Sequence, residues 1–174
     1  MSEREETTAM LSKMVQRRCE SRHRFSAPEV MLEDPKTGNA VRVDFMGFDP
    51  YMCGSPYPNP SSVGLGKFTA YEVKSCWADL TSGHGLNILG DQNFLVTTNE
   101  VADRLTNGEM ASLRRRLDEV LVPIGGRLCV ARRCKCFAHS ERYRYSNDEL
   151  LLAIFMAQTH HAPIKINEIK KAES

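Results

Sequence analysis

The spacing of apolar residues predicts a helix at the start of the chain. Met10, Leu11, Met14 and Val15 form a stripe with helical periodicity. Ser2 and Glu5 have the spacing of a capping box, so we expect this helix to span roughly residues 3–22. The Ala27-Pro28 pair is expected to end it, because the residue before a proline disfavours helical geometry.

Five further segments have the composition or alternation of strands: residues 29–32, 40–45, 67–74, 93–97 and 127–130. Turn formers fill residues 33–39 and predict a chain reversal between the first two strands. Residues 49–66 contain four prolines and three glycines, and we expect them to form a loop. The strands on either side are too short to build separate cores, so this loop is not interpreted as a domain linker.

Helical patterns separate and follow these strands. A short helix is predicted around residues 76–81, and Thr97 and Glu100 have capping spacing for another. We expect that second helix to break near residues 107–108. It is then expected to resume along an apolar stripe of Met110, Leu113, Leu117, Val120 and Leu121.

A last helix is predicted over about residues 147–159, because Ser146 and Glu149 have capping-box spacing. The tail at residues 162–174 is expected to fray. Helices thus alternate with strands along the chain. This order predicts a single α/β domain over residues 1–174, with its core over about residues 5–135.

Composition agrees with one soluble domain. The 174 residues are 41% hydrophobic and 26% charged, and no apolar run reaches the roughly 18 residues that would indicate a membrane span. The chain starts Met-Ser-Glu-Arg-Glu-Glu, without the basic and apolar regions of a secretory signal. We therefore expect a cytoplasmic protein that has no membrane partner and whose six cysteines are reduced thiols. A homo-oligomer is compatible with this composition.

Charge is divided unevenly along the chain, although the formal net charge is only +1. Residues 25–103 carry four lysines and arginines against ten acidic residues, whereas residues 104–174 carry thirteen against eight. The acidic part could hold a divalent cation and the basic part could bind a polyanion. The alternative is a solvated surface on which charges cluster by chance.

The second and third predicted strands each place charged residues on one face. Side chains alternate along a strand, so Glu72 and Lys74 point together, away from the apolar face of their strand. Asp44 points away from Val43 and Phe45, which share the apolar face of the other strand. If the two strands are neighbours, Asp44 and Glu72 converge with Lys74 beside them.

Two carboxylates and an ammonium group suit a hard divalent cation. Magnesium prefers oxygen ligands and is typically held by one or two carboxylates together with water and phosphate oxygens. Asp44 and Glu72 would supply the carboxylates, and the backbone carbonyl of Val73 a further oxygen. Lys74 could orient a coordinated water or neutralise charge on a phosphate. The set is therefore suited to metal-assisted phosphodiester hydrolysis.

Asp44 followed by Glu72-Val73-Lys74, with a helix before them and helix and strand after, resembles the PD-(D/E)XK nuclease superfamily. The order of elements carries the resemblance over roughly residues 5–135. Two departures are visible. Val43 stands where the proline that names the motif would be, and 28 residues that include the predicted loop separate Asp44 from Glu72.

The resemblance implies a restriction-endonuclease-like fold, a three-layer α/β domain with a mixed central sheet flanked by helices. It implies a nuclease that depends on Mg²⁺ or Mn²⁺ and hydrolyses DNA, with RNA not excluded, in repair, recombination, defence or a mobile element. Asp44, Glu72 and the Val73 carbonyl would bind the metal, and Lys74 would be the catalytic lysine. Two alternatives stay open: a non-catalytic nucleic-acid-binding or regulatory protein on the same fold, and a zinc-stabilised interaction module.

Auxiliary candidates lie close to this set in sequence. Asp79 could contact the metal or orient a water, or be an exposed helical acid. Ser75 could contact a phosphate or cap a helix. His84, in the glycine-punctuated loop 82–86, could donate to a phosphate or simply be solvated. Glu29 could point at the site from the preceding strand, as could Glu5 or Glu6 of the first helix.

A basic run in the second half of the chain could follow a phosphate backbone without reading its sequence. It consists of Arg114, Arg115, Arg116, Arg127, Arg132, Arg133 and Lys135. A solvated face is the alternative interpretation.

The zinc alternative depends on Cys129, Cys134, Cys136 and His139. Cys-x-Cys is not the usual paired spacing of zinc ligands, and no Cys-x-x-Cys pair accompanies it. Scattered reduced thiols are therefore the preferred interpretation of these cysteines.

Overall fold

The computed structural model describes residues 2–52, 54, 57, 59–83, 85–107, 109–134 and 145–159. Four of the predicted site residues, His84, Lys135, Cys136 and His139, lie outside this part of the chain, as does the predicted tail. The helices are α1 (Glu3–Arg22), α2 (Pro60–Gly64), α3 (Trp77–Thr81), α4 (Asn99–Thr106), α5 (Ala111–Arg114) and α6 (Asn147–Gln158). The strands are β1 (Phe25–Glu33), β2 (Ala40–Asp49), β3 (Lys67–Lys74), β4 (Gln92–Thr97), β5 (Glu119–Ile124) and β6 (Arg127–Arg133).

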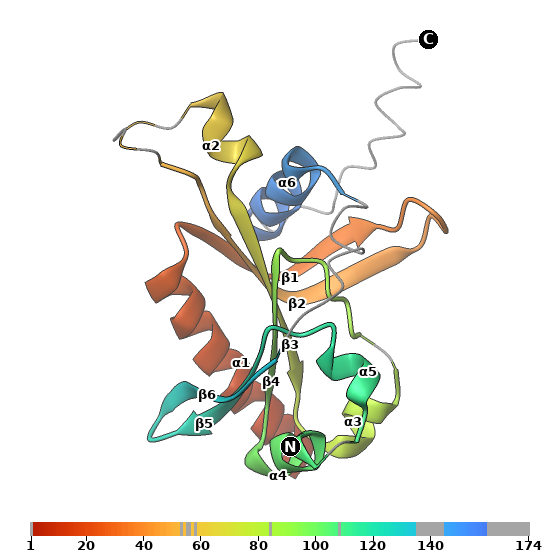
Figure 1. The fold of residues 1–174 in the computed structure, drawn as a ribbon. Helices are drawn as coiled ribbons and strands as arrows, with labels where there is room; N and C mark the ends of the chain where they lie inside the picture. The colour runs from red at the N-terminus through yellow and green to blue at the C-terminus, as the bar shows by residue number, and fades with distance from the viewer. Residues whose placement is uncertain are drawn as a thin grey trace.

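One six-stranded sheet with the order β1 to β6 forms the centre of the molecule (Figure 1). Strands β1, β2 and β3 are antiparallel neighbours, β3, β4 and β5 run parallel, and β6 returns antiparallel to β5. The parallel steps need crossover connections, which α3, α4 and α5 provide. The α/β class expected from the sequence is thus confirmed as an open mixed sheet packed with helices.

Helices cover both faces of the sheet. On one face α1 buries Leu11 and Val15 against a set that includes Tyr71. On the other face there are two separate apolar clusters. The first joins α6 to β1, β2 and the early part of β3, and the second joins α3, α4 and α5 to β4 and β5. We call these the α6 cluster and the α4 cluster.

The first helix and its cap agree with the sequence pattern, but its end does not. Ser2 and Glu5 form the predicted capping box, and α1 stops at Arg22. The Ala27-Pro28 pair, expected to end the helix, lies instead inside β1. This is possible because β1 is an edge strand, where a residue without an N–H group need not interrupt the sheet.

The helix predicted through Leu117 and Leu121 was wrong. In the segment from Met110 to Leu121 only α5 is helical, and β5 begins at Glu119. Val120 and Val122 are buried in the α4 cluster while Leu121 is buried against α1. A strand that is buried on both faces produces a continuous apolar run, which periodicity alone does not distinguish from a buried helix.

The last helix is close to its prediction, and the predicted loop contains a short helix. Ser146 and Glu149 form the capping box of α6. Within the segment 49–66, α2 forms at its carboxyl end, with Pro60 in its first turn.

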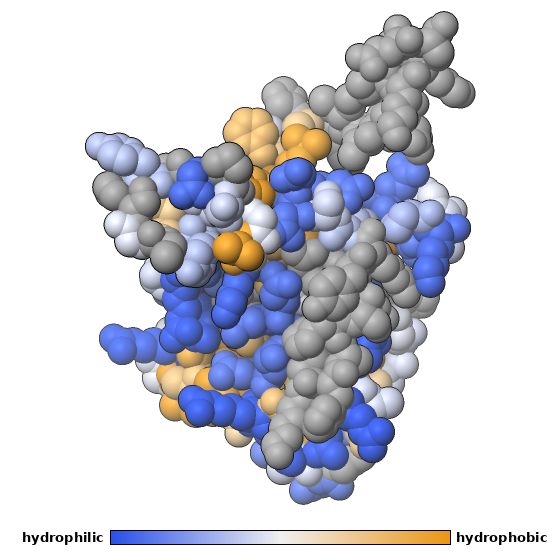
Figure 2. Space-filling view, turned by 45° about the horizontal axis from the view of Figure 1, so that its top comes forward, coloured by the Kyte–Doolittle hydropathy of each residue, from blue (hydrophilic) through white to orange (hydrophobic). Residues whose placement is uncertain are grey.

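No helix in the described part of the chain is long and apolar enough to cross a membrane. Hydrophilic side chains dominate the described surface of the face shown in Figure 2, with apolar residues in small groups between them.

Candidate active site

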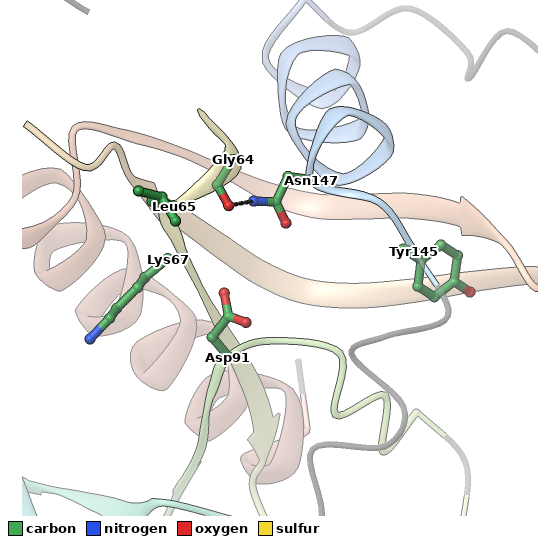
Figure 3. A pocket seen from close by; sticks show the side chains of 7 residues that line it. Gly64, Leu65, Lys67, Asp91, Tyr145 and Asn147 are labelled. Atoms are coloured by element: carbon green, nitrogen blue, oxygen red, sulfur yellow. Dashed lines mark hydrogen bonds between the residues drawn. The ribbon is translucent and has the colours of Figure 1, made fainter. Parts of the chain in front are cut away.

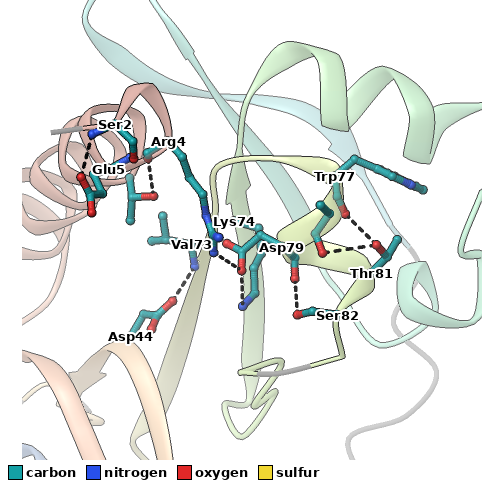
Figure 4. Close-up of polar contacts among 12 residues, drawn as sticks. Ser2, Arg4, Glu5, Asp44, Val73, Lys74, Trp77, Asp79, Thr81 and Ser82 are labelled. Carbon is teal, nitrogen blue, oxygen red and sulfur yellow. Dashed lines mark hydrogen bonds and ion pairs between the residues drawn. The ribbon is translucent and has the colours of Figure 1, made fainter.

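Strands β2 and β3 separate at the predicted site. They pair from Asp49 and Lys67 as far as Phe45 and Tyr71, and both strands continue beyond the last pair. At this fork the Asp44 side chain, and not the backbone of β2, accepts the hydrogen bond from β3. Its Oδ2 accepts a hydrogen bond of 2.9 Å from the Val73 N–H (Figure 4). The carboxylate is thereby fixed between the two strands.

The strands β1 and β2 are also irregular at Asp44. Their pairing skips Glu29 and Asp44, which face each other, and Glu29 has a φ of 49°. Val43 packs in the α6 cluster, whereas Phe45 packs against α1. Residues two apart on a regular strand share a face, so the alternation reverses at Asp44. The expectation that Val43 and Phe45 lie on one face was therefore wrong.

Glu72 lies at the seam between the α6 cluster and the α4 cluster. Ala70, two residues earlier on its face of β3, belongs to the first, and Leu95, its neighbour on β4, belongs to the second. Glu72 is only 2% exposed. A buried carboxyl group thus lies in the sheet between residues of the two apolar clusters.

The surroundings of Glu72 satisfy only part of its carboxyl group. Oε1 accepts a hydrogen bond of 3.2 Å from the Asn87 N–H, and Oε2 is buried without a partner among the described residues. Burial first, and then the neighbouring Asp44 carboxylate, raise the pKa of Glu72 to about 10, against the opposing effect of Lys74. The carboxyl group is therefore neutral near pH 7 unless a cation binds beside it.

Lys74 follows on the same face of β3 and is 6% exposed. Its Nζ lies 4.0 Å from Asp79 Oδ1 on α3. The same oxygen accepts a hydrogen bond of 3.1 Å from Arg4 Nη2 (Figure 4). Asp79 thus joins Lys74 of β3 to Arg4 of α1. Gly85, at a φ of +62°, passes beside Lys74, and a Cβ atom there would lie 3.3 Å from Nζ.

Asn87 joins the loop after α3 to both β2 and β3 at the site. Its backbone binds Glu72, and its Nδ2 donates a hydrogen bond of 2.6 Å to the Arg42 carbonyl on β2. Sequence reasoning missed Asn87 because no side-chain spacing identifies a residue that acts through its backbone. The neighbouring Leu86, Ile88 and Leu89 pack into the two apolar clusters and hold it in place.

The auxiliary candidates have different outcomes. Asp79 Oδ1 lies 4.0 Å from Lys74 Nζ, and its predicted contact with a metal or a water stays a prediction. Ser75 is buried, and its Oγ has no hydrogen-bond partner within the described ranges. Glu29 faces Asp44 across the strands, but its exposed carboxylate lies 3.4 Å from Arg42 Nη1. Glu5 of the first helix is used by the helix cap. His84 lies outside the described residues.

The described residues of the basic run belong to two separate elements. Arg114, Arg115 and Arg116 lie in and just after α5, and Arg127, Arg132 and Arg133 lie on β6. Arg133 Nε lies 3.7 Å from Glu119, and Arg132 donates to the Thr106 carbonyl. Strand β6 is separated from β3 by two intervening strands.

The predicted zinc ligands are described only in part. Cys129 and Cys134 are both half-buried, and Cys136 and His139 lie outside the described residues. Within the described part of the chain, no group of three or more histidines, cysteines and acidic residues is arranged to hold a metal ion. The Asp44 and Glu72 pair supplies two carboxylates.

Two hollows lie away from these residues. One, of about 420 Å³, lies between α2, β3 and the start of α6; Asp91 points into it while Lys67 extends away (Figure 3). The other is an apolar groove of about 530 Å³ that Phe25, Phe48 and Phe155 help to line. Neither contains a residue of the predicted catalytic set.

Comparisons of the chain with protein-family models, curated proteins and solved structures return no match. The chemistry of the site therefore follows from its own groups. Asp44 and Glu72 place two carboxyl groups at a fork in the sheet, and Lys74 adds a positive charge on the face of Glu72. Such a set can hold a divalent cation and stabilise negative charge on a phosphate.

Proposed function

We propose that this protein is a divalent-metal-dependent nuclease of the PD-(D/E)XK type, with a restriction-endonuclease-like fold, that hydrolyses phosphodiester bonds in DNA. One observation carries the proposal. Asp44 and Glu72 meet where β2 and β3 separate, and Lys74 lies on the face of Glu72. The order helix, three antiparallel strands, helix and parallel strand agrees with what the resemblance implies.

The residues at the fork fit a cation. Glu72 Oε2 is buried without a partner in the described structure, and the neighbouring Asp44 charge helps to raise the pKa of Glu72. A buried carboxylate needs a positive partner to stay ionised. The Asp44 and Glu72 carboxylates would hold Mg²⁺ or Mn²⁺ together with the Val73 carbonyl. The bound cation would polarise the scissile phosphate and lower the pKa of a coordinated water.

The other groups orient the reactants. Lys74 is nearly fully buried. Its ammonium group lies beside Asp79, and Asp79 in turn accepts a hydrogen bond from Arg4. A fixed ammonium group in a site that excludes bulk water stabilises the charge that develops on the phosphate oxygens. The Asn87 N–H fixes the Glu72 carboxyl group in one orientation. Lys74 is therefore the proposed catalytic residue, and Asn87 a positioning residue.

Cleavage of nucleic acid tests the proposal. Plasmid DNA, single-stranded DNA and RNA are incubated with the protein in Mg²⁺ or Mn²⁺ and with a chelator. Lys74→Ala should reduce the rate by roughly 10²–10³-fold, since it removes the charge that stabilises the transition state. Lys67→Ala is the matched control, because Lys67 is an exposed lysine at the opposite end of the same strand.

Two results would contradict the proposal. Cleavage that survives Lys74→Ala would come from a contaminating enzyme or a different site. Binding without cleavage of any substrate would instead favour the non-catalytic protein on the same fold. Metal analysis of the purified protein is the separate test of the zinc alternative, which requires one bound zinc per chain.

A further inference from the structure

We propose that Arg4 and Arg42 bind the phosphate backbone of the nucleic acid at the entrance to this site. The inference rests on the proposed function, and it assigns backbone binding to residues outside the basic run. The two arginines come from different elements, α1 and β2, and each contacts a different carboxylate of the site.

Arg4 lies on the side of Lys74. Its Nη2 donates to Asp79 Oδ1 at 3.1 Å, and 61% of its side chain is exposed. The same Asp79 oxygen is 4.0 Å from Lys74 Nζ. Figure 4 shows the Arg4 side chain extending from α1 toward Lys74 and Asp79. The Arg4 side chain thus reaches the acid that also contacts the proposed catalytic lysine, while most of the side chain is exposed to solvent.

Arg42 lies on the side of Asp44. Its Nη2 is 3.8 Å from Asp44 Oδ1, its Nη1 is 3.4 Å from Glu29 Oε1, and 56% of its side chain is exposed. Its backbone carbonyl accepts the hydrogen bond from Asn87 Nδ2. The loop that closes over Glu72 therefore also fixes the backbone from which Arg42 extends.

The charge of the site requires such groups. Asp44 and Asp79 would repel a polyanion, and Lys74 is too buried to meet it first. A guanidinium group carries five N–H donors and binds phosphate oxygens in pairs. Exposed ion pairs contribute only about 0–1 kcal/mol. Arg4 and Arg42 can therefore exchange their carboxylate partners for phosphate oxygens at little cost.

The arginines of β6 are less well placed for this role. In the sheet β6 is three strands from β3, roughly 14 Å at the usual spacing of strands. Arg132 and Arg133 are in addition engaged with Thr106 and Glu119. Contacts at such a distance could extend a binding surface, but they would not hold the phosphate that reacts.

Binding and cleavage are measured separately so that the two proposals can fail separately. Binding of a fluorescein-labelled DNA duplex is followed by fluorescence anisotropy in the Lys74→Ala background with Mg²⁺, over a range of salt concentrations. Arg4→Gln and Arg42→Gln are compared with Arg17→Gln. Arg17 is an exposed arginine on the same helix as Arg4, about 20 Å further along it.

Arg4→Gln and Arg42→Gln should each weaken binding by roughly 3–10-fold and lower the slope of log K against log salt by about 0.9. In the Lys74-containing enzyme they should raise KM more than they lower kcat, and Arg4→Lys should recover part of the affinity. Arg17→Gln should change the affinity by less than about twofold. Melting temperatures should stay close to that of the parent, because the pairs that are lost are exposed.

The inference is overturned if neither variant binds DNA less tightly than Arg17→Gln, or if Arg127→Gln and Arg133→Gln cause the loss instead. Absence of DNA binding by the parent overturns it too. Cleavage that depends on Lys74 but not on either arginine leaves the nuclease in place and removes the inference. If both arginine variants bind DNA more weakly but no form of the protein cleaves it, the two arginines keep their binding role and the nuclease proposal fails.

Discussion

Glu72 shows how one buried group couples folding to pH. Its carboxyl group is 2% exposed, accepts one backbone hydrogen bond and leaves Oε2 without a partner among the described residues. With its pKa raised to about 10 from the ordinary value of 4.5, the folded protein holds this proton more tightly than the unfolded chain does. The stabilising contribution is therefore complete below pH 4.5 and is lost as the pH rises toward about 10.

Glu72→Gln should stabilise the metal-free protein, and more at about pH 8 than at about pH 5. Glutamine keeps the shape of the protonated carboxyl group and does not ionise. We expect a gain of roughly 1–3 kcal/mol at the higher pH, measured by urea unfolding in the presence of a chelator. The exposed Glu33→Gln is the control. An equal gain at both pH values would contradict the role given to ionisation.

Glu29 holds a backbone conformation that is unusual for a residue with a side chain. Its φ of 49° lies in the left-handed region, where only glycine is unstrained. Glu29→Gly should raise stability by about 1 kcal/mol, or roughly 2–4 °C in melting temperature. Glu33→Gly, at a regular position of the same strand, should instead lower it by roughly 0.5–1 kcal/mol. A loss in both variants would show that the Glu29 side chain matters more than its backbone.

At the scale of single residues, sequence could identify some site groups and not others. Glu72 and Lys74 share a face because alternation along β3 is a local property, whereas the alternation used to select Asp44 reverses at that residue. Arg4 and Asn87 are not visible in the sequence, since their contacts join segments that only the tertiary fold brings together. The burial of Lys74 is likewise a consequence of packing between elements.

Among the elements, the end of α1 fixes the strands that carry the site. His23, the C-cap of α1, lies 2.8 Å from Asp49 on β2 and 2.8 Å from the Tyr71 hydroxyl on β3. Its ring packs on Gly47, where a Cβ atom would overlap it. One helix end thus holds together the two strands that separate at Asp44.

Gly47→Ala should therefore destabilise the protein by roughly 1–3 kcal/mol, because the His23 ring must leave its two partners. Urea unfolding measures the effect. Gly64→Ala is the matched control, since a Cβ atom at Gly64 meets nothing within 4 Å. Equal stability of the two variants would mean that the His23 ring moves aside without loss.

Helices and strands were predictable where the apolar residues repeat with the period of only one type of element. The stripe of α1 and the alternation of β3 each agree with one structure. Strand β5 was not predictable, because burial on both faces removes the alternation that identifies a strand. The extension of β1 over Pro28 was missed since it depends on that strand being at an edge.

For the molecule as a whole, the site lies between parts that pack separately. Glu72 lies on β3 between residues of the α6 cluster and the α4 cluster. Sequence could predict the α/β class from the alternation of helices and strands. It could not predict the seam, which depends on where each helix lies across the sheet.

A cation that bridges the seam should stabilise the whole fold. Mg²⁺ at about 100 times its dissociation constant should add about 2.7 kcal/mol to the free energy of unfolding. Asp44→Asn and Glu72→Gln should remove this gain, and Lys74→Ala should keep it, because Lys74 is not a proposed ligand. Scanning calorimetry with and without Mg²⁺ measures it. A similar gain in Asp44→Asn would show that the cation binds elsewhere.

The irregular strand β1 has a consequence beyond the chemistry of the site. As an outermost strand of the described sheet it has a neighbouring strand on one side only, and such an edge in other sheets invites a second chain to add a strand. Pro28 offers no N–H group there, and Glu29 turns the backbone out of extended geometry. The edge is thereby divided into two short pieces. The distortion that frees Asp44 from the ladder also protects the protein against aggregation through this edge.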